Sequence, residues 1–402
     1  MSEWEKVPAG SVTTQRKDIV TLEPGVEYRT MGVRWYGRGA YDRGVGTTAT
    51  IKAKRLFRAH EGDFVFNRID TQKGAFDVVP AQLDGALATN EFPLYTVDPD
   101  QLSARFLLLY FQQQSVLAQI DALRAGSEGR SRWKESDFET WRIPLPSPVE
   151  QCRIVDIMAA VDAQIAALAE EIDAATYALS ALRADVPEAD EMPIASVVDG
   201  IDSGKSVQTK GEAPVPGTAR VLKLSAVQLG HFDADEAKRL DDSSGYTTTH
   251  LVRDGDLLIT RSNTPERVGY VAVASEVPPE TYLPDLIWRI RPDESRCLAT
   301  YLGHLLSATE FRARITASAS GTSKSMQKIN KRNFGSIKVP VQDSITEQEA
   351  YVAKCDGRAN AVRMVSAELT HLRSFRSTLL TSLLNQEIEI PESYDRLLEE
   401  VS

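Results

Sequence analysis

The side chains of this chain that could do chemistry are mostly basic, and they gather in two stretches. Residues 29–58 hold eight basic side chains against one acid, Asp42, and residues 312–338 hold seven basic side chains and no acid. Glycine, tyrosine and tryptophan lie between the arginines of the first stretch. Clustered lysine and arginine attract phosphates, so both stretches are candidate phosphate-binding surfaces.

The net charge of −11 at first argues against a polyanionic partner. The acid is unevenly distributed, however. Residues 150–191 hold 10 acidic and 2 basic side chains, and residues 347–402 hold 10 and 6. Residues 1–149 are balanced, with 19 of each sign, and residues 192–346 hold 19 basic and 18 acidic side chains. The basic stretches therefore lie on an acidic frame.

Motifs for catalysis, metal binding or nucleotide binding are weak. Residues 200–206 resemble a phosphate-binding loop, but only three residues separate the glycines where four are needed, and a glycine and two prolines prevent a following helix. Residues 233–236 lack the glycine and final glutamate of a calcium loop. The five histidines form no ligand spacing with each other or with the three cysteines. We therefore predict no catalytic residue and no metal site.

Two long stretches have the spacing of coiled-coil helices. Their apolar residues recur in steps of three and four, and neither stretch contains proline. One such helix cannot cover its own apolar seam, so each is expected to need a partner, and the chain supplies both. The seams comprise Ile154, Ile157, Val161, Ile165, Leu168, Ile172, Ala175, Leu179 and Leu182 in the first, and Val352, Cys355, Ala359, Val362, Val365, Leu369, Leu372, Phe375, Leu379 and Leu383 in the second. Cys152 is also expected on the first seam.

An internal repeat links the two halves of the chain. The order of matching segments is kept while the offset drifts from 193 to 197 residues, so two unrelated surface helices become a poor explanation. Residues 10–58 and 200–250 align poorly, which suggests one frame with different recognition loops. The matching segments are 62–68 with 255–261, 102–126 with 297–321, 133–144 with 329–340, and 150–151 with 347–348.

These features resemble the specificity subunit of type I restriction-modification enzymes. The resemblance covers nearly the whole chain and depends on the doubled architecture, the Ile143–Pro146 exit followed by Glu150-Gln151, and Gly126-Ser127. It implies an α+β protein with two globular α/β target recognition domains in a pseudo-twofold repeat, joined by two long antiparallel coiled-coil helices. The implied limits are 1–149 and 192–344 for the recognition domains, 150–187 and 345–387 for the helices, and 388–402 for an acidic tail.

The resemblance also implies function and partners. The chain would be a non-catalytic DNA-recognition subunit that reads a bipartite asymmetric site with its two domains, spaced by a helical ruler. It would dock two methyltransferase subunits and two restriction/translocase subunits. S-adenosylmethionine, ATP and Mg would be held by those partners, with no cofactor on this chain. We see no signal peptide or membrane span and expect a cytoplasmic, nucleoid-associated protein of a bacterium or archaeon.

Within this interpretation, side-chain type selects candidate DNA contacts. Arginine can bind guanine bidentately, asparagine can bind adenine, and glycine lets the backbone approach the duplex. For any one lysine or arginine, a solvated surface charge is the alternative. The candidates are Arg34, Tyr36, Arg38, Tyr41, Arg43, Lys52, Lys54, Arg68, Arg130, Arg132 and Lys134 in the first domain, and Lys205, Arg261, Asn263, Lys324, Lys328, Lys331 and Arg332 in the second.

The repeat and the long helices are also compatible with a protein of another class. In this alternative the chain is a non-catalytic coiled-coil scaffold whose globular domains bind protein and have no DNA specificity. The basic stretches favour DNA recognition over the scaffold.

Overall fold

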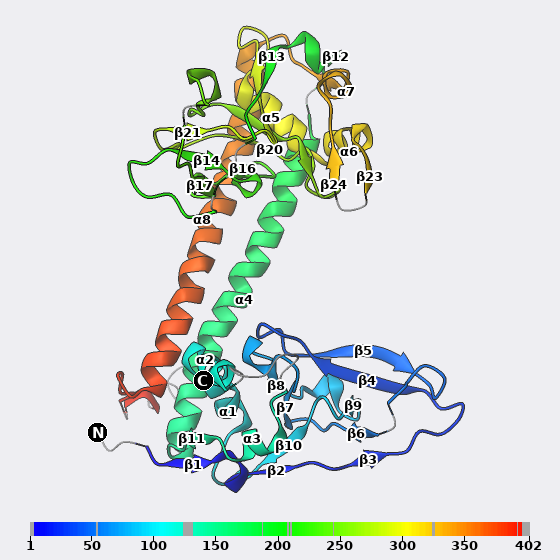
Figure 1. Ribbon diagram of the computed structural model, residues 1–402, viewed down its shortest axis with the longest axis vertical. Helices are drawn as coiled ribbons and strands as arrows, with labels where there is room; N and C mark the ends of the chain where they lie inside the picture. The colour runs from blue at the N-terminus through cyan, green and yellow to red at the C-terminus, as the bar shows by residue number, and fades with distance from the viewer. Residues whose placement is uncertain are drawn as a thin grey trace. The chain divides into compact units, whose positions relative to one another are not determined.

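A computed structural model of the chain describes residues 4–53, 55–123, 132–186, 188–206, 209, 211–243, 245–323, 326–391 and 393–395. The chain divides into two compact units: unit 1 comprises residues 1–167 and 369–402, and unit 2 comprises residues 168–368. Two long helices, α4 (Pro148–Ala184) and α8 (Ile345–Leu384), each contribute one part to each unit (Figure 1). The division between the units therefore falls within the helices.

The described part of unit 1 contains two larger sheets and one strand pair. The strand pair consists of β1 (Lys6–Pro8) and β11 (Arg142–Pro144). The first sheet has the order β2-β10-β7-β8, with β2 (Thr13–Gln15), β10 (Leu94–Val97), β7 (Phe64–Phe66) and β8 (Phe76–Val78). The second has the order β3-β6-β9-β4-β5, with β3 (Ile19–Val20), β6 (Leu56–Arg58), β9 (Leu87–Thr89), β4 (Tyr28–Val33) and β5 (Ala40–Gly46).

Short helices complete unit 1 and cover its first sheet. They are α1 (Ala104–Phe111), α2 (Gln114–Ala122) and α3 (Glu135–Glu139), with single turns η1 (Ala9–Ser11), η2 (Thr71–Lys73) and η3 (Ala81–Leu83). The hydroxyl of Ser103 caps α1 by accepting from the backbone N–H of Phe106. Phe64 of β7 stacks on Phe138 of α3 with ring centroids 5.5 Å apart. This aromatic core fixes the sheet against the helices.

Unit 2 contains a strand pair and a four-stranded sheet of the same kinds. The pair is β12 (Glu191–Pro193) with β25 (Lys338–Pro340). The sheet has the order β13-β22-β18-β20, with β13 (Val198–Ser203), β22 (Ile287–Pro292), β18 (Leu257–Thr260) and β20 (Val271–Val273). The helices are α5 (Ala299–Ser307), α6 (Thr309–Ser318) and α7 (Lys331–Gly335), with single turns η4 (Ile194–Ser196), η5 (Leu224–Ala226) and η6 (Thr248–His250).

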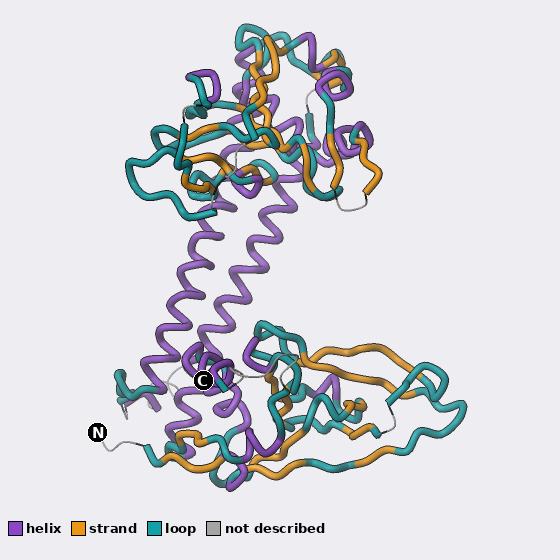
Figure 2. The backbone as a smooth tube through the Cα atoms, viewed as in Figure 1, coloured by secondary structure: helices purple, strands orange, loops and turns teal. Residues whose placement is uncertain are grey.

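The remaining strands of unit 2 form sheets shorter than the five-stranded sheet of unit 1. Figure 2 shows them as short orange segments between long loops. They form the sheets β17-β14-β21 and β19-β24-β23 and the pair β15–β16. Their bounds are β14 (Arg220–Leu222), β15 (Val227–Gln228), β16 (His231–Phe232), β17 (Ala237–Arg239), β19 (Ser262–Asn263), β21 (Thr281–Tyr282), β23 (Ser320–Ser323) and β24 (Met326–Lys328). Strand β14 pairs antiparallel with β17 and parallel with β21, as β4 pairs with β5 and β9 in unit 1. The divergence that the sequence predicts for residues 10–58 and 200–250 therefore lies in the lengths of the strands and loops around a shared pairing pattern.

The repeat also extends to a segment that the sequence comparison missed. Val7 of β1 faces Ile143 of β11, and Met192 of β12 faces Val339 of β25 in the same register. Both entry strands end in proline and continue into a single helical turn. The offset there is 185 residues rather than 193, because the divergent loops that follow differ in length.

The two long helices run in opposite directions within each unit. In unit 1, Ile154 near the start of α4 shares a core with Leu383 near the end of α8. In unit 2, Leu179 near the end of α4 shares a core with Cys355 near the start of α8. The predicted antiparallel pairing and α+β class are confirmed. The helices end at 184 and 384, where the sequence predicts 187 and 387.

Two predicted seam residues are wrong. Cys152 is exposed and Phe375 is 54 % exposed. In each place the adjacent polar residue faces inward instead, because it has a specific partner there. Gln151, next to Cys152, is buried, and Arg376, next to Phe375, forms an ion pair with Asp162. Hydrophobic spacing alone does not reveal such partners.

Among the described residues, no helix is long and apolar enough to cross a membrane.

Candidate nucleic-acid interface

The tip of the β4–β5 hairpin, residues 34–39, carries basic and aromatic side chains together in unit 1. Tyr36 is 70 % exposed and Trp35 is 39 % exposed, and Arg34 and Arg38 are exposed beside them. The backbone of Tyr36 has a φ of 62°, which places it in the left-handed region that non-glycine residues rarely occupy. Such strain persists only where the surroundings hold the residue, and it is common at functional sites.

The segment that follows β7 holds this tip in place. The backbone N–H of Tyr36 donates to the carbonyl oxygen of Lys73 at 2.6 Å, and the indole N–H of Trp35 donates to that of Ile69 at 3.2 Å. The Lys73 ammonium lies 4.7 Å from the Trp35 ring centroid. The tip is therefore fixed to the sheet core rather than projecting alone.

Asp77 of β8 supplies a second anchor for the hairpin. Its carboxylate accepts the backbone N–H of Ala40, the first residue of β5, at 2.5 Å. The same carboxylate lies against Gly39, where a side chain would clash with it and where φ is +69°. Burial raises the pKa of Asp77, although hydrogen bonds from Ala40 and Val78 act in the opposite direction. A partly buried carboxylate thus sets the geometry of the tip.

Three arginines of the hairpin have guanidinium groups available for a ligand. Arg34, Arg38 and Arg43 are exposed and take part in no ion pair among the residues that the structure describes. The Arg34 guanidinium lies 4.2 Å from the Tyr41 ring centroid. Tyr41 and Arg43 both border Gly32 across the hairpin. Five of the predicted contacts thus lie on one hairpin: Arg34, Tyr36, Arg38, Tyr41 and Arg43.

The neighbouring basic residues Arg68, Arg132 and Lys134 lie on the edge beside this hairpin. Ile69 and Arg132 form a β-bridge, so the two segments meet. Arg68 has only 17 % of its side chain exposed and pairs with Glu135 at 3.5 Å, whereas Arg132 is half exposed and pairs with Glu91 at 2.8 Å. Arg68 therefore has a structural contact that the sequence does not indicate, while Arg132 and the exposed Lys134 remain accessible.

Three predicted contacts, Lys54, Arg130 and Lys324, lie outside the described residues. Lys52 is exposed in the loop that follows β5.

In unit 2, predicted contacts gather around Trp288 of β22. The Arg261 guanidinium lies 5.7 Å and the Lys331 ammonium 5.9 Å from the Trp288 ring centroid. The strands β19 and β24 place Asn263 opposite Gln327 and Ser262 opposite Lys328. Arg261, Asn263, Lys328 and Lys331 are thus brought together, although no fixed spacing in the sequence indicates it.

Lys205 and Arg332 lie beside this cluster. Lys205 forms a β-bridge with Pro284, and its carbonyl oxygen accepts the backbone N–H of Asp285. The next residue, Leu286, accepts the backbone N–H of Arg261 at 2.8 Å, which places Lys205 near that arginine. The Lys205 ammonium donates to the carbonyl oxygen of Gly245, and Arg332 is exposed on α7.

The two clusters occupy equivalent places in the repeated frame. The carbonyl oxygen of Arg68 accepts the backbone N–H of Trp133 at 3.0 Å, and that of Arg261 accepts the backbone N–H of Ile329 at 3.0 Å. Arg68 lies two residues after β7 and Arg261 one residue after β18, and both strands are inner strands of their four-stranded sheets. The frame therefore presents one candidate recognition edge per unit, with different side chains on each.

Sequence reasoning missed three residues of these edges: Trp35, Asp77 and Trp288. Trp35 lies between the predicted contacts Arg34 and Tyr36, and that position in the sequence could have identified it. Nothing local distinguishes Asp77 or Trp288, because their roles arise from contacts with residues 37 and 27 positions away.

Among the described residues, no three His, Cys, Asp or Glu side chains gather as metal ligands. The motif at residues 200–206 includes the end of strand β13 and the bridge of Lys205 with Pro284, and the described residues between 207 and 219 form no helix. What these edges offer is positive charge, hydrogen-bond donors and aromatic faces, which are the components of nucleic-acid recognition.

Comparison with known proteins agrees with this arrangement. Residues 1–176 match the family model of the type I restriction modification DNA specificity domain. The chain is 26 % identical over 186 residues to the type I restriction enzyme EcoEI specificity subunit of Escherichia coli, in an alignment covering 44 % of this chain and 31 % of that protein. The match thus spans about a third of the length of the curated relative.

Solved structures share the fold along nearly the whole chain. A chain solved in work on complex assembly and conformational transition of the type I R-M system matches with a TM-score of 0.56 at 18 % identity, covering 95 % of this chain and 97 % of that chain. The type I restriction-modification system S subunit from M. genitalium matches with a TM-score of 0.52 at 16 % identity, covering 94 % and 96 %. At these identities the likeness shows the fold alone. The chain is thus similar to type I restriction-modification specificity subunits in sequence over residues 1–176 and in fold over nearly its whole length.

Proposed function

We propose that this chain is the sequence-specific DNA-recognition subunit of a type I restriction-modification complex and reads a bipartite, asymmetric site. The observation that supports this proposal best is the duplicated frame with two dissimilar edges. Arg68 and Arg261 occupy the same place in the two units, yet the side chains on each edge and the lengths of the surrounding strands and loops differ. Two readers of different sequences, one per unit, account for a constant frame with variable edges.

In unit 1 the β4–β5 hairpin is the proposed reading element. Arg34, Arg38 and Arg43 would contact phosphates or guanine edges, and the aromatic ring of Tyr36 would pack against the sugar or a base. The anchors at Lys73 and Asp77 fix the hairpin before DNA arrives. Preorganisation of this kind reduces the entropy lost on binding. In unit 2, Arg261, Asn263 and Lys331 take the corresponding part.

The helices α4 and α8 are the proposed ruler between the two readers. Each helix continues without interruption from one unit into the other. After one reader binds, the second binds its half-site at a raised effective concentration, provided that the spacing between half-sites suits the ruler. Recognition should therefore depend on the number of base pairs between the half-sites.

The chemistry belongs to partners in this proposal. The chain is non-catalytic and docks two methyltransferase subunits and two restriction/translocase subunits. S-adenosylmethionine, ATP and Mg are bound by those partners and not by this chain. The complex works on DNA in the cytoplasm of a bacterium or archaeon.

The alternative of a protein-binding scaffold is separated from this proposal by the dependence of DNA binding on salt. Each neutralised phosphate contributes about −0.9 to the slope of log binding constant against log salt concentration. With methyltransferase subunits present, we expect a steep negative slope and a preference for one duplex sequence over a shuffled one. Absence of binding, or binding indifferent to salt, would favour the scaffold.

A further inference from the structure

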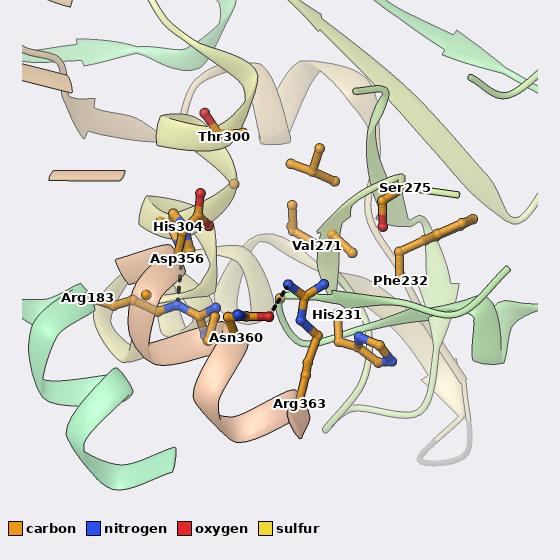
Figure 3. A pocket seen from close by; sticks show the side chains of 16 residues that line it. Arg183, His231, Phe232, Val271, Ser275, Thr300, His304, Asp356, Asn360 and Arg363 are labelled. Carbon is orange, nitrogen blue, oxygen red and sulfur yellow. Dashed lines mark hydrogen bonds and ion pairs between the residues drawn. The ribbon is translucent and has the colours of Figure 1, made fainter. Parts of the chain in front are cut away.

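Unit 2 contains a cavity of about 570 Å³ between the long helices, α5 and the strands β16 and β20 (Figure 3). Its volume is in the range of small-molecule sites in proteins. Val271 and Phe232 form part of an apolar wall, and Thr300 and Ser275 add hydroxyl groups. It lies away from the edge formed by Arg261 and Trp288, neither of which lines it.

The cavity is built around a buried arginine of α4. Arg183 is only 5 % exposed and lines the cavity. Its Nε donates to Nδ1 of His304 at 3.4 Å, and its guanidinium packs against Gly230, where an added Cβ would lie 2.2 Å from Nη2. Arg183 takes part in no ion pair among the residues that the structure describes. Burial lowers the pKa of Arg183, the direction expected for a cation held in an apolar site.

One carboxylate lines the cavity, and it has another partner. Asp356 accepts from Nε2 of His304 at 2.9 Å, and 59 % of its side chain is exposed to solvent. Arg363 also lines the cavity and donates to Asn360 at 3.2 Å (Figure 3). The lining thus contains two arginines but only one carboxylate, and that carboxylate is hydrogen-bonded to a histidine.

Unit 1 has a cavity of about 580 Å³ in the equivalent place, between the long helices, α1 and β8. There the lining arginine is Arg376 of α8, which is partly buried and forms an ion pair with Asp162 of α4. Gln151 and Gln348 align the two helices with an offset of 197 residues, so Ala359 occupies the position of Asp162 in unit 2. Ala359 lines the unit 2 cavity. The carboxylate that pairs with Arg376 in unit 1 is therefore missing at the matching position of unit 2, where the lining carboxylate, Asp356, accepts from His304 instead.

We propose that the unit 2 cavity binds a small organic oxyanion, a carboxylate or phosphate, whose charged group contacts Arg183 and Arg363. A buried charge is costly unless it is paired, and Arg183 lacks the partner that Arg376 has. The guanidinium fork suits the bidentate geometry of carboxylate and phosphate. The volume exceeds what one carboxylate fills, so the ligand carries a further body against Val271 and Phe232. The site is independent of DNA recognition.

The first test measures thermal unfolding of the full chain without DNA, in chloride, acetate or inorganic phosphate at equal ionic strength. Acetate or phosphate should raise the midpoint of unit 2 in a saturable manner by roughly 2–4 °C. Arg183→Met should remove this response, and Arg376→Met, the matched change in the other cavity, should leave it intact. Response to one oxyanion alone identifies which class the site takes.

Ala359→Asp is the second variant, because it restores the carboxylate that unit 1 possesses. It should abolish the oxyanion response by occupying Arg183 internally, and it should raise the midpoint in chloride. Two results would overturn the proposal: equal midpoints of the wild-type chain in all three salts, or an oxyanion response that survives in both Arg183→Met and Ala359→Asp. Neither result depends on whether the chain binds DNA.

Discussion

The side-chain oxygen of Gln151 accepts the backbone N–H of Ser103 at 2.8 Å, which ties the start of α4 to the residue that caps α1. The amide nitrogen of Gln151 donates to the carbonyl oxygens of Gln101 and Pro146 at 2.7 and 2.9 Å. Gln348 makes the same three contacts in unit 2, with the N–H of Leu298 and two carbonyl oxygens. Both glutamines are almost fully buried.

Replacing Gln151 with leucine should destabilise unit 1 by roughly 2–4 kcal/mol, because three hydrogen bonds are lost and their backbone partners stay buried. Urea unfolding of the full chain measures the loss, and faster amide exchange at Ser103 localises it. Gln119→Leu, at an exposed position of α2, is the control and should change stability by no more than about 0.5 kcal/mol. An unchanged exchange rate at Ser103 would contradict the assigned role of the glutamine.

Alanine at Arg34, Arg38 or Arg43 should weaken DNA binding without unfolding unit 1. Each change that removes a phosphate contact should reduce the magnitude of the salt slope by about 1. Arg373→Ala is the matched control, since that exposed arginine lies on α8 rather than on the hairpin. Equal effects of Arg373→Ala and Arg38→Ala would mean that general charge, and not the hairpin, governs binding.

Asp77→Ala distinguishes geometry from charge. It removes a negative charge beside the hairpin, so electrostatics alone would strengthen DNA binding. It also removes the acceptor for the Ala40 N–H, which should loosen the tip and weaken binding about three- to tenfold. Asp77→Asn keeps an acceptor oxygen and should bind more tightly than Asp77→Ala. Tighter binding by Asp77→Ala, measured by titration at one salt concentration, would remove Asp77 as a positioning residue.

Cysteine reactivity tests the packing of α5 and α8. Burial raises the pKa of the Cys297 thiol from its ordinary 9.0 to about 12, and Cys355 is also buried, whereas Cys152 is exposed. Iodoacetamide at pH 8 should therefore modify Cys152 alone until urea unfolds unit 2, as peptide mass spectrometry would reveal. Rapid modification of Cys297 in the folded chain would contradict the packing.

The same shift gives an alkaline pH dependence. A thiol whose pKa is raised by folding contributes stability that is complete below pH 9 and is lost as pH rises toward 12. Unfolding of unit 2 should therefore become easier across this window, and Cys297→Ala should flatten the dependence in proportion to that thiol's share. If Cys297→Ala leaves the pH dependence of unfolding unchanged, other groups cause that dependence. Tyr301 is one such group, because its pKa is also raised to about 12.

The sequence predicts the frame because the frame repeats and is periodic. The matching Gly-Asp turns at 62 and 255 begin equivalent strands, and the Glu-Gln pairs begin both long helices. The entry strands at Lys6 and Glu191 escaped notice, because three residues with little identity carry no signal until pairing with β11 and β25 is visible.

The recognition edges are less predictable, because they depend on contacts far apart in the chain. The basic composition of residues 29–58 identifies the hairpin, but it does not show that Arg68 is paired with Glu135 while Arg38 lies unpaired among the described residues. Likewise, Lys331 and Arg261 are 70 residues apart and meet only over Trp288. The predicted DNA contacts stay predictions until binding is measured.

The most direct test of the account exchanges residues 1–149 for the corresponding domain of a known specificity subunit and maps DNA methylation in cells. Strains that carry the original gene, the exchanged gene or no gene are compared. We predict a split methylated motif that is absent without the gene, and of which one half alone changes after the exchange. A methylation pattern that is the same in all three strains, or a motif whose two halves change together, would contradict two independent readers on one frame.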